Sequence, residues 1–348
     1  MEQIILFTFL TLFPFGQIIR IGIIQPLDIV VGIGAVWAIV KKLPKPKIFT
    51  YFQDFLLVAA FSWVFGAAIF WQVEVFYGLL YLIRLAAYFY FLILVSHFRH
   101  KKLLLNSLLA VVSASAIFGW IQYFWWPDLR PLLAIGWDEH YYRLVGTFLD
   151  PGYLALILVF GIILAFFKQK YFLLFFLLLT LAFTYSRAGY LAFFAALIPM
   201  WFFSAKTRVV SILALSLLSF ILFLPRPGGE GVKLERVTSI VLRIANYRET
   251  FSIFKTSPVF GAGYNNLCLA KGGNFSSHSC SGSDSSLLFI LATTGLAGFI
   301  YFIYLVLNIF RRTPHTTYYI LHTTAVALVT HSFFSNSIFY PWILGWLI

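Results

Sequence analysis

Apolar stretches long enough to cross a lipid bilayer follow one another along nearly the whole chain. The 348 residues are 61% hydrophobic and only 11% charged, with a mean hydropathy of +0.91. A soluble domain is about half apolar and about a quarter charged. Because the hydrocarbon core of a bilayer, about 30 Å thick, needs about 20 residues per helix, this pattern excludes a soluble globule. It predicts a membrane protein that crosses the bilayer many times.

We count about twelve such stretches and predict an all-α, polytopic transmembrane helical bundle, with ten to twelve spans as the range. The stretches begin near Ile4, Leu27, Phe55, Phe76, Leu103, Leu144, Tyr171, Ala188, Val209, Ser285, Tyr318 and Ser337. The first lacks a basic start and a small-residue cleavage site, so we interpret it as a retained helix and not a signal peptide. Residues 1–348 are predicted to form one transmembrane domain, in which residues 225–283 are an exoplasmic loop insertion between spans 9 and 10.

Basic residues predict the orientation of these spans. Thirteen of the 25 Lys and Arg residues fall in five short connections: Lys41, Lys42, Lys45 and Lys47; Arg99, Lys101 and Lys102; Lys168 and Lys170; Lys206 and Arg208; Arg311 and Arg312. These are alternate connections, and Lys and Arg gather on the cytoplasmic side of membrane proteins. We therefore expect both termini in the cytoplasm and the 225–283 loop outside.

The charge of the 225–283 loop is the second unusual feature. The loop contains three acidic residues, Glu230, Glu235 and Glu249, and seven basic ones: Arg226, Lys233, Arg236, Arg243, Arg248, Lys255 and Lys271. Topology gives no reason for positive charge outside the membrane. An anion would explain it, and we expect that anion to be a phosphate.

Both cysteines of the chain, Cys268 and Cys280, lie in this loop. In an oxidising compartment they could pair and close a 13-residue ring, a constraint of about 3 kcal/mol by loop entropy. Two free thiols remain the alternative.

Two arginines next to or within apolar spans are functional candidates, because a charge in the membrane is costly. Arg187 lies in the turn Thr184-Tyr185-Ser186-Arg187-Ala188-Gly189, and Arg84 lies within an apolar stretch with no partner evident from the sequence. Guanidinium groups match phosphate oxygens in pairs. The alternative is an arginine that reaches toward the membrane surface without chemistry.

Within the loop, residues 237–254 have the pattern of an amphipathic helix with an apolar stripe of Val241, Ile244, Tyr247 and Phe251. Such a helix could also serve only as an anchor at the lipid headgroups. The following Pro258-Val259-Phe260-Gly261-Ala262-Gly263 predicts a tight turn. As a bare Gly-x-Gly it is weak support for phosphate binding, and we favour a structural role.

A polar segment precedes the apolar stretch that begins near Ser285. His278 and Asp284 in this segment are the pair best suited to accept a proton beside a cationic loop. Asp284 could instead be the N-cap of the next helix, and His278 could be an ordinary loop residue. His322 and His331 lie in an apolar stretch, and we expect them to be packed. No His, Cys, Asp and Glu cluster has metal-ligand spacing, so we predict no metal.

In this order, the motifs resemble the O-antigen ligase superfamily, which includes O-antigen polymerases. The matching stretches are Arg143-Leu144-Val145-Gly146-Thr147-Phe148, Asp150-Pro151-Gly152-Tyr153-Leu154-Ala155, Thr184 to Gly189, Arg243 four residues before Tyr247, Pro258 to Gly263, and the polar segment before Gly295-Leu296-Ala297-Gly298. Members are bundles of the GT-C-like type that move a glycan from a polyprenyl diphosphate carrier to an acceptor hydroxyl at the outer leaflet, without metal or nucleotide sugar.

The resemblance implies that Arg187 and Arg243 hold the diphosphate, with Arg143 and Arg248 as weaker candidates. The position where ligases carry a histidine is Asp284 here, so Asp284 or His278 is the implied base. The implied partners are a polyprenyl-diphosphate-linked glycan, a glycan, glycolipid or other hydroxyl acceptor, and membrane lipids, with no cofactor and no nucleic acid. The implied location is the bacterial inner membrane, with the active site on the exoplasmic face. A polymerase of the same superfamily is the first alternative, and a transporter of lipid-linked sugars or small molecules is the second.

Overall fold

A computed structural model describes the chain from residue 1 to 348, apart from residues 21, 23, 204, 274, 276–279, 281, 313 and 314. The described residues form helices and no strand, with one isolated antiparallel bridge between Asp128 and Tyr141. The prediction of an all-α fold is therefore confirmed for this part of the chain.

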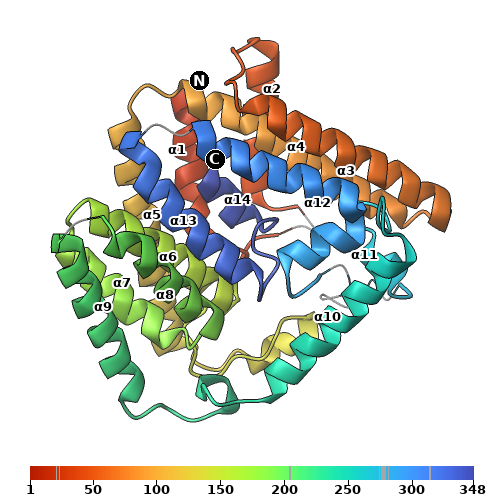
Figure 1. Cartoon of the computed structure of the whole chain (residues 1–348). Helices are drawn as coiled ribbons and strands as arrows, with labels where there is room; N and C mark the ends of the chain where they lie inside the picture. Colours follow the sequence, from red (N-terminus) through yellow and green to blue (C-terminus); the bar gives the residue numbers. More distant parts are fainter. Residues whose placement is uncertain are drawn as a thin grey trace.

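The helices follow the apolar stretches closely (Figure 1). In order they are α1 (Glu2–Leu12), α2 (Pro26–Val40), α3 (Phe49–Phe70), α4 (Val75–His97), α5 (Lys101–Trp125), α6 (Pro151–Phe167), α7 (Tyr171–Phe183), α8 (Arg187–Trp201), α9 (Ala205–Phe223), α10 (Thr238–Thr256), α11 (Leu267–Ala270), α12 (Ser286–Arg312), α13 (His315–Ser332) and α14 (Pro341–Leu347).

Five helices, α3, α4, α5, α9 and α12, are long and apolar enough to cross a membrane, and several shorter apolar helices accompany them. The predicted total of about twelve spans is not confirmed. The last predicted span, from Ser337, is the seven-residue helix α14, which at 1.5 Å per residue is only about 10 Å long.

The sixth predicted stretch begins seven residues too early. Residues 146–148 form a 3-10 turn, and α6 begins only at Pro151. Asp150 is its N-cap, because the carboxylate accepts hydrogen bonds from the backbone N–H groups of Gly152 at 2.6 Å and Tyr153 at 2.9 Å. An Asp followed by Pro is a strong start signal for a helix. The apolar residues before it misled the hydropathy count.

Connecting segments that are predicted to lie on the same side of the membrane contact one another. Contacts among the predicted outer segments join Pro14 to Thr147, Leu144 to Phe183, Arg187 to Leu234 and Tyr247 to Phe333. Contacts near the predicted cytoplasmic segments join Asn106 to Lys168 and Gln169 to Lys206. Each of these contacts joins two segments that the sequence assigns to the same side of the membrane.

Arg84, which had no partner in the sequence, forms an ion pair with Asp28. Its Nη2 lies 2.6 Å from Asp28 Oδ2, and both side chains are 13% exposed. Asp28 also accepts a hydrogen bond from the backbone N–H of Gln25 at the start of α2. The pair therefore joins α2 to α4, and this accounts for a charge within an apolar stretch without a catalytic role.

We expect Asp28→Ala to destabilise the fold by about 3 kcal/mol or more, because it leaves the buried Arg84 charge without its carboxylate. Thermal unfolding of the purified protein in detergent measures this effect. The control is Asp128→Ala, which removes the exposed Asp128–Arg130 pair and should leave the unfolding temperature nearly unchanged. Equal unfolding temperatures for the two variants would show that the Asp28–Arg84 pair does not hold α2 to α4.

The Gly-x-Gly turn of residues 258–263 packs into a break in α12. Gly295, with φ 65° and ψ −165°, interrupts the helix. The carbonyl of Val259 lies where a Cβ on Gly295 would be, and Leu296 N–H donates to the carbonyl of Pro258 at 2.8 Å. Ser62 Oγ of α3 donates to the carbonyl of Phe260. This turn joins α3 to α12, which supports the structural interpretation of the motif.

Candidate active site

The segment after α9 runs across the molecule to α10, which packs on α12 (Figure 1). The predicted helix over residues 237–254 is present as α10, Thr238–Thr256. Its polar residues turn inward at spacings of three and four: Arg243, Asn246, Tyr247 and Thr250 contact the segments around residues 283–284 and 333–334. The polar face of α10 therefore faces the protein.

Most of the predicted apolar stripe of α10 faces away from the protein. Val241, Ile244 and Phe251 are 59%, 44% and 41% exposed, whereas Tyr247 points inward and donates its hydroxyl hydrogen to the carbonyl of Phe333. An apolar outer face and a polar inner face suit a helix placed between lipid and a polar site. Three of the four stripe residues therefore lie where a helix on the membrane surface would present them, and Tyr247 is the one that turns toward the protein.

Asp284 is held beside α10 through its backbone. Its N–H donates to Asn246 Oδ1 at 2.9 Å, and the neighbouring Ser283 Oγ accepts from Thr250 Oγ1 at 3.4 Å. Asp284 is not the N-cap of α12. Ser285, directly before the helix, accepts the hydrogen bond from the backbone N–H of Leu288.

The side-chain carboxylate of Asp284 differs from its backbone N–H in its contacts. Among the described residues it has no hydrogen-bond or ion-pair partner. Partial burial raises its pKa above the ordinary aspartate value, while the charges of Arg243 and Lys271 oppose this rise and Asp138 adds to it. A carboxylate with a raised pKa is a better general base.

Arg243 projects from α10 into the same region. Its Nε is buried and has no hydrogen-bond partner in the described part of the chain, and its guanidinium carbon lies 5.9 Å from the ring centre of Phe334. A buried donor without an acceptor is costly. Among the described residues, Arg243 therefore keeps a buried donor that is available to an added acceptor.

Arg187, the first residue of α8, uses most of its guanidinium on the protein. Its Nη1 donates to the carbonyls of Leu234 and Arg236 at 3.2 and 2.8 Å, and its Nη2 donates to Ser239 Oγ at 2.5 Å. These bonds hold the residues before α10 against the start of α8. Arg187 therefore positions α10 while it keeps a positive charge close to Arg243.

Arg143 and Arg236 also bind the turn before α8. Arg143 donates to the carbonyls of Thr184 at 3.1 Å and Tyr185 at 3.2 Å, and Arg236 donates to Tyr185 at 3.5 Å and to two carbonyls of its own segment. Burial, together with the charge of Arg236, lowers the pKa of Arg143 to about 10. The pKa of Arg236 is lowered by burial and by the charges of Arg187 and Arg243.

We refer to Arg143, Arg187, Arg236 and Arg243 as the arginine cluster. Within the part of the chain that the structure describes, none of the four forms an ion pair with a carboxylate, although Arg226 nearby in sequence pairs with Glu235. Four guanidinium groups from three separate segments therefore gather without a directly paired carboxylate, and Arg243 is the one whose charge acts on Asp284. Such a site is suited to a multiply charged anion.

Two of the predicted site residues are not in this cluster. Arg248 is exposed on α10 and makes no contact with the cluster, because it is five residues from Arg243 and so lies on another face of the helix. His278 lies outside the described residues.

Two histidines are buried near the site. His331 shares a hydrogen bond of 2.6 Å between its Nδ1 and Ser337 Oγ, as expected of a packed residue. His140 was not noticed in the sequence. It is 6% exposed, and neither ring nitrogen has a partner among the described residues. Burial and the charges of Arg143 and Arg236 lower its pKa to about 3, so the ring is neutral at pH 7. No motif in the sequence indicated this position.

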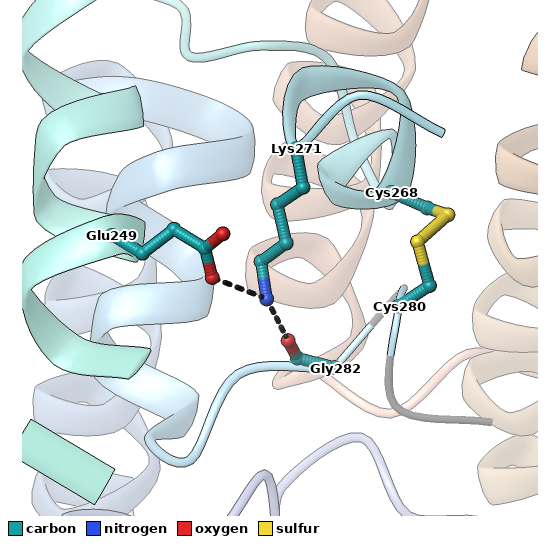
Figure 2. The surroundings of a disulfide bond; sticks show 5 residues. All are labelled: Glu249, Cys268, Lys271, Cys280 and Gly282. Atoms are coloured by element: carbon teal, nitrogen blue, oxygen red, sulfur yellow. Dashed lines mark hydrogen bonds and ion pairs between the residues drawn. A yellow bond between two sulfur atoms is a disulfide. The ribbon is translucent and has the colours of Figure 1, made fainter. Parts of the chain in front are cut away.

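Cys268 and Cys280 form a disulfide beside the site (Figure 2). Cys268 belongs to the short helix α11, and Cys280 lies four residues before Asp284. The disulfide therefore closes the loop that leads into Asp284.

The fold and the site together define a class: an all-helical membrane protein with a cationic site that is assembled beside an apolar bundle. The family model of the O-antigen ligases matches residues 172–303. This match confirms the resemblance to the O-antigen ligase superfamily. The matched residues include Arg187, Arg236, Arg243 and Asp284, while Arg143 lies before them. No curated protein matches the chain.

The family implies a ligase-type or polymerase-type membrane glycosyltransferase that uses a lipid-linked glycan and a glycan acceptor. With the apolar helices, it indicates a protein of the bacterial inner membrane.

Proposed function

We propose that the chain transfers a glycan from a polyprenyl diphosphate carrier to an acceptor hydroxyl at the outer leaflet, without a metal. The observation that carries this proposal is Arg243. Its buried Nε has no partner among the described residues, and its charge lies close enough to the Asp284 carboxylate to oppose the rise of the Asp284 pKa. An anion site next to a base meets the two needs of the reaction. The match to the O-antigen ligase family supports the same chemistry.

In the proposed reaction, Asp284 takes the proton from the acceptor hydroxyl as the hydroxyl oxygen attacks the anomeric carbon. The bond between that carbon and the diphosphate oxygen breaks, and the polyprenyl diphosphate leaves with the electron pair. Negative charge grows on the leaving oxygens, and Arg243 with the remaining donors of the arginine cluster stabilises it. Attack opposite the leaving group inverts the anomeric centre.

We place the site on the exoplasmic side. The positive loop of residues 225–283 and the basic clusters of the alternate connections support this orientation. A disulfide also suits an oxidising compartment. Residues 225–283 then act as an insertion that supplies Arg236, Arg243 and the segment leading to Asp284.

The test is a transfer assay with the purified chain, a polyprenyl-diphosphate-linked oligosaccharide and a set of hydroxyl acceptors. We expect a covalent glycan product and free polyprenyl diphosphate without added metal and in the presence of a chelator. Addition to a lipid acceptor indicates a ligase, and lengthening of the donor glycan indicates a polymerase. Movement of the donor across a vesicle membrane without any product would instead identify a transporter.

A further inference from the structure

Lys271 follows helix α11 and lies between two parts of the site (Figure 2). Its Nζ is 3.3 Å from Glu249 Oε2 of α10 and 3.0 Å from the carbonyl oxygen of Gly282. The lysine side chain is only 10% exposed, whereas that of Glu249 is 50% exposed. The largely buried ammonium group of Lys271 thus joins α10 to the loop segment that leads to Asp284.

This contact works together with the disulfide. Cys268 and Lys271 are three residues apart, and their partners Cys280 and Gly282 are two apart. The same short helix is therefore fastened twice to the segment before Asp284, once by a covalent bond and once by a charged hydrogen bond. The hydrogen bond from Lys271 to Gly282 is nearer in sequence to Asp284 than the disulfide is, and it carries a positive charge.

We propose that Lys271 is a positioning residue for Asp284: it holds the Gly282 carbonyl against α10 and places a positive charge close to the segment that carries the carboxylate. This inference deepens the proposed function, because it concerns the base of that reaction. The charge of Lys271 acts on Asp284 in the direction expected, since it opposes the rise in pKa caused by burial.

Other charged and titratable groups lie close enough to Asp284 to interact with its charge. They come from α10, from the loop before α6 and from α6 itself: Arg243, Tyr247, Asp138 and Tyr153. Arg243 and Lys271 favour the ionised carboxylate, whereas Asp138 disfavours it. Loss of Lys271 therefore removes one of two favourable charges and leaves the unfavourable one in place.

The first test compares Lys271→Met and Lys271→Arg with the control Lys255→Met, which changes an exposed lysine of α10. We expect Lys271→Met to lower kcat by roughly tenfold to a hundredfold, the range that a displaced reacting group produces, with less than about a twofold change in donor KM. The acidic limb of the pH–rate profile of Lys271→Met should move to higher pH. Lys271→Arg, which keeps the charge, should restore most of kcat and the limb, and Lys255→Met should match the unsubstituted protein.

A second readout needs no substrate. Dicyclohexylcarbodiimide reacts with protonated carboxyl groups, so its attachment to Asp284 across a pH series, followed by peptide mass spectrometry, reports when this carboxylate ionises. We expect the midpoint for Asp284 to lie at higher pH in Lys271→Met than in the unsubstituted protein and in Lys271→Arg. Asp284→Asn identifies the labelled site.

The outcomes separate the two proposals. Absence of transfer by the unsubstituted protein with every donor would overturn the proposed function, while the labelling series would still decide on Lys271. Identical labelling midpoints in Lys271→Met and the unsubstituted protein would overturn the positioning role. If Lys271→Met is too unstable to purify, Lys271→Arg carries the test. Its labelling midpoint for Asp284 should equal that of the unsubstituted protein, and a displaced midpoint would contradict the proposal.

Discussion

Arg243→Ala is expected to lower the rate of glycan transfer about a thousandfold, the effect of removing a donor that stabilises developing negative charge. The reason lies in the structure: Arg243 is the member of the arginine cluster that donates no hydrogen bond to the described part of the protein. Arg143, Arg187 and Arg236 each donate to carbonyl groups. Loss of Arg243 should therefore remove substrate binding without loss of the fold.

The measurement is initial transfer rate with the purified variant, together with its thermal unfolding temperature. Arg248→Ala is the matched control, because it removes an exposed arginine from the same helix and should leave the rate within about twofold. Arg243→Lys should recover only part of the activity, since an ammonium cannot pair with two phosphate oxygens as guanidinium does. Equal rates for Arg243→Ala and Arg248→Ala would remove Arg243 from the site.

Asp284→Asn should lower kcat by roughly a hundredfold to ten-thousandfold, the contribution of a positioned general base. The amide keeps the size of the side chain but cannot take a proton. Because Ser285 and not Asp284 caps α12, the substitution should leave the helix start and the unfolding temperature unchanged. Kinetics at saturating donor measure this effect. A kcat close to that of the unsubstituted protein would show that Asp284 is not the base.

We expect the same residue, Asp284, to set the pH dependence of transfer. Burial raises the pKa of Asp284, and a general base acts only when it is deprotonated. The transfer rate should therefore be maximal above this raised pKa and should fall as the pH decreases through it. The fall should occur at a higher pH than for an ordinary aspartate. A rate profile measured with a buffer series of constant ionic strength tests this. A limb at the ordinary aspartate position would contradict the environment described for Asp284.

Hydropathy predicted the helices well because the membrane selects long apolar stretches. The predicted starts near Leu27, Phe76 and Tyr171 lie within one residue of α2, α4 and α7. The pattern failed where short-range polar signals matter. Asp150 and Pro151 start α6 despite the apolar residues before them, and α14 is too short to cross a bilayer. Side-chain partners over long separations, such as Asp28 with Arg84, leave no local signal.

For the site, residue types were predictable but their partners were not. The excess of positive charge pointed to an anion, and Arg187, Arg243, Arg143 and Asp284 are all near the site. Which arginines bind backbone carbonyls and which keep a free donor depends on the carbonyls that each can reach. This depends on how the loops fold. The same holds for Arg236 and Lys271, which the sequence shows only as two of seven basic residues in one loop.

The central claim is that the arginine cluster receives the diphosphate of a polyprenyl-linked donor at Arg243. The most direct measurement is an experimental structure of the purified chain, in a lipid nanodisc, with a polyprenyl diphosphate added. We predict phosphate density within hydrogen-bonding distance of the Arg243 guanidinium, on the side that faces Asp284. Diphosphate density elsewhere, for example against Arg226 and Lys233 in the segment that follows α9, with Arg243 unoccupied, would contradict the claim.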